Sequence, residues 1–245
     1  MKVIKINKDL LKICAHGCYV DSPVYFDGSW FVRWLNWKKL SVLFNMGSPN
    51  GITLDLACGN GVALPTLSKV CDEVYAVDLH TEAARKLRDG LKLVNVNILE
   101  TDAYDLPFPD KMFDTIIAAS ALEHFENIDG ILSEIQRVLK PSGQFYFLVP
   151  SENWLYRLGR AVLGYTKPAD HYHTAKEILK AIEKYFKPVK SKAWPLKLLP
   201  VYEMAVIRKL QFAEYDYRAM AINAWGNEFQ KRIDDDMYNF LTQPR

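Results

Sequence analysis

The stretch Asp55-Leu56-Ala57-Cys58-Gly59-Asn60-Gly61 decides the fold of this chain. It continues a run of mostly apolar residues that predicts a strand over 52–57, and it leads into a predicted helix over 62–70. Gly59 and Gly61 have no Cβ, so the backbone can turn tightly here and approach a ligand closely. The start of the next helix is expected to present free N–H groups beside this turn. The stretch therefore predicts a strand, a binding turn and a helix.

A second strand is predicted over 73–78, and it ends in Asp78, 19 residues after Gly59. A carboxylate at this place can accept hydrogen bonds from both hydroxyls of a ribose. A nicotinamide dinucleotide would also require glycine at position 64, where this chain has leucine. The two segments predict a nucleoside-binding crevice at the carboxyl ends of adjacent strands, and Leu64 argues against a dinucleotide.

Strands and helices alternate along most of the remaining chain, which is typical of an α/β protein with a parallel sheet. Further strands are expected at 94–99, 113–119 and 144–149, followed by an antiparallel pair at 189–194 and 202–209. Further helices are expected at 81–90, with Thr81 and Gly90 as caps, and at 131–139, with a stop at 140–143. Another is expected from the capping box Thr174–Glu177 to 186, and a last one around 229–240.

Length, composition and charge restrict the functional class. The chain has 245 residues, 49% hydrophobic and 24% charged, with a net charge of +2, which excludes wholesale disorder and a protein-wide basic surface for nucleic acid. No apolar run approaches the ~18–20 residues of a membrane helix. Charges interrupt the apolar residues of Met1–Asp9, so we expect no signal peptide there. Four cysteines predict no disulfide framework, and the expected location is the cytoplasm.

Asp55, Gly59 and Gly61, with Ala57 where many relatives have glycine, resemble motif I of the class I S-adenosylmethionine-dependent methyltransferases. Other stretches resemble further motifs of this family in the same order. They are Val77-Asp78, Thr101-Asp102-Ala103 with Leu106-Pro107-Phe108, Ala121-Leu122-Glu123-His124-Phe125 and Ile135 to Gln144. The resemblance covers about residues 50–150, extends through the last two strands toward 210, and is strongest to quinone and sterol C-methyltransferases and small-molecule N- and O-methyltransferases.

This resemblance implies a three-layer Rossmann-like methyltransferase fold, with a mostly parallel seven-stranded sheet whose last strand is antiparallel. A single domain over 1–245 is expected. Its parts are an N-terminal aromatic helical flap (1–50), a cofactor-binding core (51–150), a lid or acceptor insert (151–175), a closing helix and strands (176–210) and a C-terminal helical extension (211–245).

The resemblance also implies S-adenosyl-L-methionine as cofactor and S-adenosyl-L-homocysteine as product. The cofactor-binding residues that it implies are Asp55, Ala57, Gly59, Asn60, Gly61, Asp78, Leu79, Asp102, Ala103 and Ser120. Methyl transfer is an in-line displacement from an activated donor, so orientation of the reactants can supply most of the catalysis. A strong cofactor site and a weak catalytic signature are therefore expected.

His124 is the candidate base, because imidazole titrates near neutral pH; the alternative is that it caps or packs its loop. By resemblance, the acceptor pocket contains Trp30, Trp34, Glu123, Tyr156, His171 and His173. The pair His171 and His173 can also lie in a surface loop, and without a nearby acidic cluster it makes a poor metal site.

Two further segments carry open alternatives. Residues 30–37 contain three of the six tryptophans, and Phe31, Trp34 and Leu35 are placed to share one face of a helix that packs on the sheet or closes over the active site. Cys14, His16 and Cys18 could bind zinc, but no fourth ligand follows at a suitable spacing, and we expect no metal.

Charge is unevenly divided. Residues 151–197 contain ten basic and four acidic residues, which indicates a solvated helix face, an anionic or lipid-like acceptor, or peripheral contact with an acidic membrane. The predicted function is methyl transfer to such a small molecule. The alternatives are a nucleic-acid or protein methyltransferase and a non-catalytic cofactor-binding subunit; residues 119–122 lack the signature of base amino-methylation. The acceptor, the methylated atom and the oligomeric state stay open.

Overall fold

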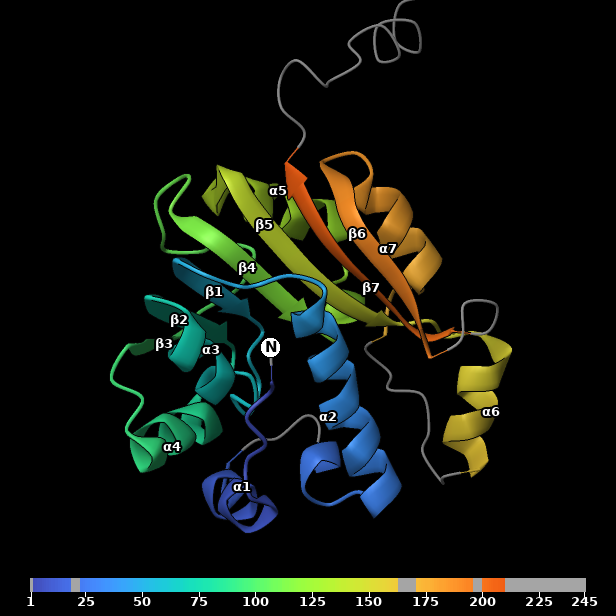
Figure 1. The fold of residues 1–245 in the computed structure, drawn as a ribbon. Coiled ribbons are helices and arrows are strands. Elements are labelled where there is room, and N and C mark those ends of the chain that lie inside the picture. The colour runs from blue at the N-terminus through green and yellow to red at the C-terminus, as the bar shows by residue number, and fades with distance from the viewer. Residues whose placement is uncertain (1, 19–22, 163–170, 196–199, 210–245) are drawn as a thin grey trace, which may run out of the picture. The chain divides into compact units, whose positions relative to one another are not determined.

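The computed structural model of the chain describes residues 2–18, 23–162, 171–195 and 200–209. Within them, seven strands form one sheet in the order β3-β2-β1-β4-β5-β7-β6 (Figure 1). The strands are β1 (Ile52–Leu56), β2 (Glu73–Asp78), β3 (Val96–Glu100), β4 (Phe113–Ala119), β5 (Leu139–Pro150), β6 (Phe186–Pro195) and β7 (Pro200–Lys209).

The sheet is parallel from β3 to β5 and antiparallel beyond it. β1 pairs with β2 and with β4 in parallel, whereas β7 is antiparallel to both β5 and β6. This confirms the expected mostly parallel seven-stranded sheet, and it confirms the expected antiparallel pair at its end. In the sheet, β1 lies between β2 and β4 and is parallel to both. The carboxyl ends of these three strands therefore lie together.

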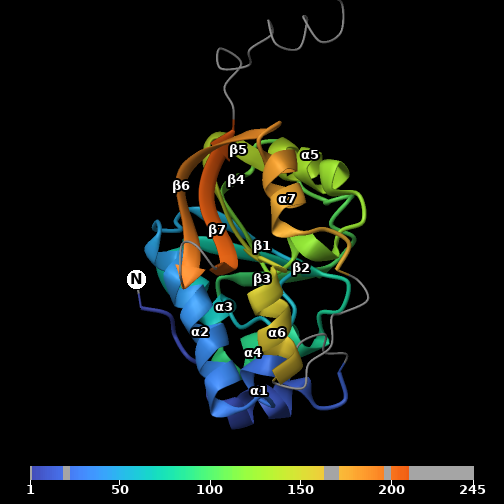
Figure 2. The same cartoon turned by 90° about the vertical axis from the view of Figure 1, so that its right-hand side faces the viewer.

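Helices cover both faces of the sheet, and Figure 2 shows the two layers edge-on. The helices are α1 (Lys8–Ala15), η1 (Pro23–Tyr25), α2 (Trp30–Asn45), α3 (Leu64–Val70), α4 (Glu82–Leu91), η2 (Leu122–His124), α5 (Ile128–Val138), α6 (Trp154–Val162) and α7 (Ala175–Ile182). One apolar core joins α1 to α4 with one face of the sheet, and a second joins α5 and α7 with the other face. The three-layer α/β architecture is thus confirmed.

Local sequence explains these elements. β4 contributes Ile116, Ile117 and Ala118 to the interior, all fully buried, as expected of a central parallel strand. The predicted capping box is present at the start of α7, where Thr174 and Glu177 exchange side-chain-to-backbone hydrogen bonds. The apolar face of α7 then packs Ile178 and Ile182 into the second core.

Several boundaries differ from the sequence prediction. α5 ends at Val138 and β5 begins at once at Leu139, so residues 140–143 belong to the strand rather than to a helix stop. α4 continues past Gly90 to Leu91, so the C-cap is Lys92, in the left-handed conformation, rather than the predicted Gly90. The register with β4 shifts here, because Leu139 pairs with Phe113 and Gln144 with Thr115, so residues 140–143 form an irregularity within β5.

Of the two interpretations of residues 30–37, the one in which Phe31 and Trp34 pack on the sheet is wrong, and the one in which they cover the active site stays a prediction. Val32, Lys39 and Leu43 face the interior, whereas Phe31 and Trp34 are about two-fifths exposed and their rings stack 5.9 Å apart. Helical spacing alone allows either face, and the buried one carries Asn36 and Lys39 because these polar side chains find partners there.

Some expectations fall on residues outside the described ranges. They include part of the acceptor insert at 163–170 and the extension at 211–245, with its predicted helix around 229–240. Within the described ranges, no helix combines the length and the apolar composition needed to cross a membrane.

Candidate functional site

The turn after β1 has the backbone that its glycines allow. Gly59 and Gly61 have φ of 52° and 73°, and Ala57 also lies in the left-handed region at 53°. The Cys58 N–H donates to the Val77 carbonyl of β2, 3.0 Å away, so the turn is tied to the neighbouring strand. A non-glycine residue at positive φ is uncommon and often marks a functional turn.

The two glycines differ in what surrounds them. A Cβ added at Gly59 would meet no atom within 4 Å, which leaves open space over this backbone. A Cβ at Gly61 would lie 2.8 Å from Leu64 Cδ1 and 3.2 Å from Ala84 Cβ. Gly61 therefore serves the close packing of α3 and α4, whereas Gly59 keeps a backbone surface accessible.

Two N–H groups at the start of α3 are already used within the turn. The Gly61 N–H donates to the Cys58 carbonyl over 2.9 Å, and the Leu64 N–H donates to the Gly61 carbonyl over 3.0 Å. These two groups are therefore not available to a ligand.

Asp78, at the end of β2, faces the turn. Its Oδ2 accepts from the Gly59 N–H over 2.7 Å, and its Oδ1 accepts from the His80 N–H over 3.1 Å. Each carboxylate oxygen has two lone pairs, so each can accept one further hydrogen bond, for example from a hydroxyl. The carboxylate is thus fixed in position by backbone donors.

Asp55 is buried at the end of β1 and is 3% exposed. Its Oδ2 has no hydrogen-bond partner among the described residues. Burial, and secondarily the negative charge of Asp78, raise the pKa of Asp55 to about 7. A buried carboxyl group without a partner is unfavourable by itself and needs a donor, such as a cation or a hydroxyl or amine of a ligand.

The remaining predicted cofactor residues surround the same end of the sheet. Leu79 is 62% exposed after β2, and Ala103 is buried. Asp102 is exposed, and its Oδ1 accepts from the Tyr104 N–H over 2.9 Å. Ser120 follows β4 with φ of 59°. Asn60 lies half-buried in the turn.

Sequence reasoning missed Lys39. This buried α2 lysine donates to Ser120 Oγ over 3.1 Å and lies 4.9 Å from the centre of the Tyr202 ring. Burial lowers its pKa to about 8, opposed by the nearby Glu123 carboxylate. Its spacing within an apolar helix, Val32, Asn36, Lys39 and Leu43, is the only signal that would have found it.

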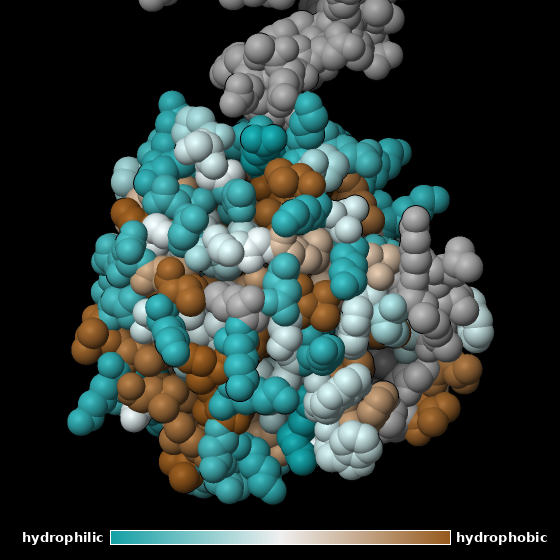
Figure 3. Space-filling model, in the orientation of Figure 1, coloured by the Kyte–Doolittle hydropathy of each residue, from teal (hydrophilic) through white to brown (hydrophobic). Residues whose placement is uncertain are grey.

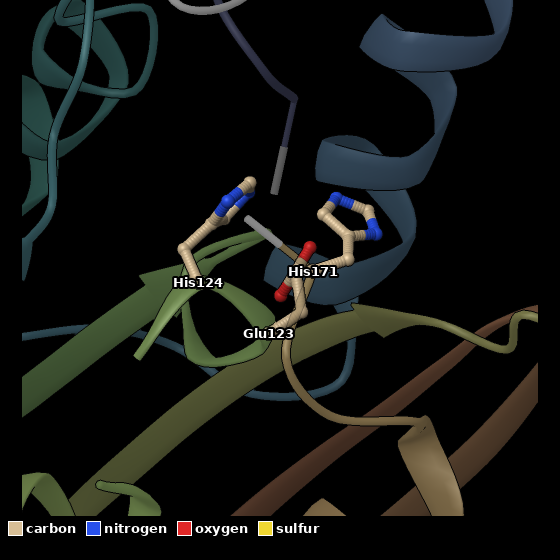
Figure 4. Close-up of side chains that lie close together, drawn as sticks. All are labelled: Glu123, His124 and His171. Atoms are coloured by element: carbon tan, nitrogen blue, oxygen red, sulfur yellow. The ribbon is translucent and has the colours of Figure 1, made fainter. Parts of the chain in front are cut away.

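Glu123, His124 and His171 come together beside this lysine (Figure 4). One ligand atom of each lies within 4.8 Å of the others. The His124 and His171 rings pack edge to face at 4.7 Å, and His171 Nδ1 lies 3.0 Å from Glu152 Oε1. Burial raises the pKa of Glu123 to about 7, despite the opposing charges of His124 and Lys39.

The other predicted acceptor residues are placed differently. Tyr156 packs on Tyr202 with ring centres 5.9 Å apart, and His173 Nε2 lies 3.0 Å from the Glu126 carbonyl. Trp30 and Trp34 lie on the outer side of α2, 73% and 43% exposed.

Cys14, His16 and Cys18 do not form a ligand set in the described part of the chain, where the one group of three converging ligands is the cluster above. Cys14 is buried, and burial raises the pKa of its thiol. The Cys18 thiol instead points to the Cys14 carbonyl, 3.4 Å away.

Comparison with known proteins identifies the central region. Residues 54–147 match the family model described as "Methyltransferase domain". These residues are similar to a methyltransferase domain. The chain is also 34% identical over 123 residues to the ubiquinone/menaquinone biosynthesis C-methyltransferase UbiE of Burkholderia mallei, which covers 48% of this chain and 51% of that protein. The chain thus spans about half the length of the curated relatives it matches.

Solved structures agree on the fold. The PH0226 protein of Pyrococcus horikoshii superimposes with a TM-score of 0.63 at 25% identity, over 78% of this chain and 97% of that one. The N-methyltransferase NodS of Bradyrhizobium japonicum, solved with S-adenosyl-l-homocysteine, gives a TM-score of 0.60 at 16% identity, over 82% and 99%. At that identity the second likeness shows the fold alone.

The residues present suit the cofactor of this family, S-adenosylmethionine. The open backbone at Gly59, the fixed carboxylate of Asp78 and the unpartnered oxygen of Asp55 line one end of the sheet. A flat nucleoside needs close backbone approach, its ribose needs a hydroxyl acceptor, and its amino acid part carries an ammonium group.

Proposed function

We propose that this protein is an S-adenosylmethionine-dependent methyltransferase that transfers a methyl group to a small or lipid-like molecule. The observation that carries this proposal is the pair of carboxylates at the ends of β1 and β2 beside the accessible backbone of Gly59. Asp78 accepts from the ribose hydroxyls, and Asp55 stabilises the positive charge of the amino acid part. The other proposed cofactor contacts are Ala57, Asn60, Gly61, Leu79, Asp102, Ala103 and Ser120.

Catalysis follows from orientation. The cofactor supplies a methyl group on a sulfonium, which needs only an aligned acceptor for in-line displacement. His124 is the proposed base for an acceptor that must lose a proton. Glu123 and His171 lie beside it, and Glu152 fixes the His171 ring. The acceptor is proposed to lie against these side chains and Tyr156, with Trp30, Trp34 and His173 at the rim.

The acceptor is proposed to be partly apolar. Exposed Trp154, Leu158 and Val162 lie on α6, and Figure 3 shows hydrophobic surface in that region, at the lower right. The exposed Arg157 lies on the same helix. A lipid-like molecule with an anionic group, or the surface of an acidic membrane, matches this combination. The name of the Burkholderia relative, a ubiquinone/menaquinone biosynthesis C-methyltransferase, agrees with a lipid-like acceptor.

The proposal extends to organisation and location. Residues 1–50 supply the aromatic cover, 51–150 the cofactor core, 151–175 the acceptor insert and 176–210 the closing elements of one domain over 1–245. All four cysteines are free thiols, as is usual in a reducing compartment, and we place the protein in the cytoplasm. No contact described here favours a nucleic-acid substrate.

Calorimetric titration with S-adenosylhomocysteine tests the cofactor site. Asp78→Ala is expected to weaken binding by roughly 10- to 100-fold, because hydrogen bonds to a charged group contribute about 1.5–3 kcal/mol. Asp89→Ala on the exposed side of α4, where the carboxylate pairs only with neighbouring Arg88, is the matched control and should bind as the parent does. Equal affinity of Asp78→Ala and the parent would refute the proposed ribose site.

A further inference from the structure

A group of metal-ligand side chains stands beside the proposed acceptor position. Glu123 and His124 lie in η2, directly after β4, and His171 lies 47 residues later, in the segment that leads into α7. Figure 4 shows the three side chains pointing toward one another. Among the described residues, this is the group of at least three His, Cys, Asp or Glu residues whose ligand atoms converge.

Hydrogen bonds from the two residues that follow His171 fix its position. The next residue, Tyr172, donates its N–H to the Glu123 carbonyl over 2.9 Å, and the His173 ring reaches the Glu126 carbonyl at 3.0 Å. These two contacts fasten the residues directly after His171 to η2 and to the loop that follows it. The ligand atoms are therefore brought together by the backbone, and not only by flexible side chains.

Glu152 orients the His171 ring. The side chains of His171 and Glu152 are 7% and 6% exposed, and Nδ1 lies 3.0 Å from Oε1. A carboxylate oxygen accepts, so this contact places the ring proton on Nδ1 and makes Nε2 the ring nitrogen that carries a lone pair. A carboxylate behind a histidine in this way is the usual outer partner of a metal-bound imidazole.

Glu123 supplies the negative charge. It is 2% exposed, and its Oε2 has no hydrogen-bond partner within the described ranges. Two carboxylates, Glu123 and Glu152, and one buried lysine, Lys39, lie close enough to interact electrostatically at this site. A buried carboxylate oxygen that lacks a hydrogen-bond partner and lies next to two imidazoles favours the binding of a cation.

We propose that Glu123, His124 and His171 bind one divalent transition-metal ion, with Glu152 as the outer partner of His171. Two imidazoles and one carboxylate suit zinc and iron(II), and they leave at least one position for water or another oxygen. Ligand bonds to zinc are about 2.0–2.2 Å long, so the present spacing has to close by roughly 1 Å through side-chain rotation. The site does not depend on the proposed methyl transfer.

His124 takes part in both the proposed methyl transfer and the proposed metal site. A metal-bound imidazole does not take up a proton, so with an ion present His124 would be a ligand instead of the base. The ion would lower the pKa of a coordinated acceptor hydroxyl, whose proton would pass to solvent water. This part rests on the proposed function, whereas metal binding itself is measured without cofactor or acceptor.

Zinc titration of the full chain tests the site. The protein is stripped with a chelator, dialysed, and titrated with zinc by calorimetry in competition with a weak chelator. We expect one zinc per chain. His171→Ala and Glu123→Gln should each weaken binding at least 100-fold, and Glu152→Gln by roughly 10- to 100-fold, as for outer partners in other metal sites. Circular dichroism melting checks that each variant is folded.

Two controls make the outcome decisive. His16→Ala removes a histidine at the end of α1, outside the cluster, and should leave zinc affinity unchanged. Cys14→Ser/Cys18→Ser removes the two cysteines of the other candidate zinc site and should also leave it unchanged. The proposal is overturned if the parent binds no zinc at micromolar concentration, or if binding survives His171→Ala and is lost in the cysteine variant.

Discussion

The backbone N–H of Gly59 donates to Oδ2 of Asp78 across 2.7 Å, and this single contact joins the turn after β1 to the end of β2. The hydrogen bond holds the carboxylate beside the accessible backbone of the turn. Both proposed halves of the nucleoside site, the close backbone approach and the hydroxyl acceptor, therefore depend on one geometry at the carboxyl ends of the central strands.

The two glycines of the turn should respond differently to alanine. Gly59→Ala adds a Cβ into open space, so the free energy of unfolding should fall only by the ~1–2 kcal/mol of the left-handed backbone. Gly61→Ala additionally drives its Cβ against Leu64 and Ala84, which should cost about 1–3 kcal/mol more. Urea unfolding of both variants measures this difference.

Gly59→Ala also distinguishes an effect on cofactor binding from an effect on folding. Affinity for S-adenosylhomocysteine should drop in folded Gly59→Ala, because the new methyl group occupies the space proposed for the cofactor. A Gly59→Ala protein with parental affinity would place the cofactor elsewhere.

Asp55 should make stability depend on pH. Its pKa of about 7 in the folded protein lies above the ordinary value of 3.8, so the folded state binds more protons between these two values. Stability from this group is present at low pH and is lost as the pH rises from about 4 to about 7. Asp55→Asn cannot titrate, so its free energy of unfolding should fall less than that of the parent between pH 5 and pH 7.5 in urea experiments. An identical fall in the two proteins would show that Asp55 ionises normally.

His124→Ala should reduce turnover by roughly 100-fold or more with an acceptor that must lose a proton, the usual effect of removing a general base. Affinity for S-adenosylhomocysteine should stay near the parental value. Release of S-adenosylhomocysteine with a panel of candidate acceptors measures turnover, and His16→Ala at the end of α1 is the control. Parental turnover in His124→Ala would exclude a role in the reaction.

The exposed face of α6 should bind acidic lipid surfaces. Vesicles with anionic lipid are expected to retain more protein than neutral vesicles at low salt, since Arg157 adds charge attraction to apolar Trp154 and Leu158. Trp154→Ala/Leu158→Ser should lose this retention. Val94→Ser removes an apolar residue that is 97% exposed near β3, and it should not. Equal binding to both vesicle types would remove the membrane proposal.

Sequence patterns predicted the central strands and the motif residues because both are local. Asp55, Gly59 and Asp78 are read from strand–turn–helix spacing, and the structure places them at neighbouring strand ends. The partners of Lys39 and the contact between Glu152 and His171 could not be predicted, since they depend on packing between segments distant in the chain. The proximity of Glu123 to His171 was hidden for the same reason, because the two residues belong to different segments.

Part of the surplus positive charge in residues 151–197 lies on an edge strand of the sheet. Because β7 lies between β5 and β6, β6 is the outermost strand, and Lys187, Lys190 and Lys192 on it are all exposed. An open strand edge invites pairing with the edge of another molecule, and lysines there oppose such contact through charge repulsion. These lysines are therefore expected to oppose aggregation through the open edge of β6. Their replacement by threonine should promote self-association at high protein concentration.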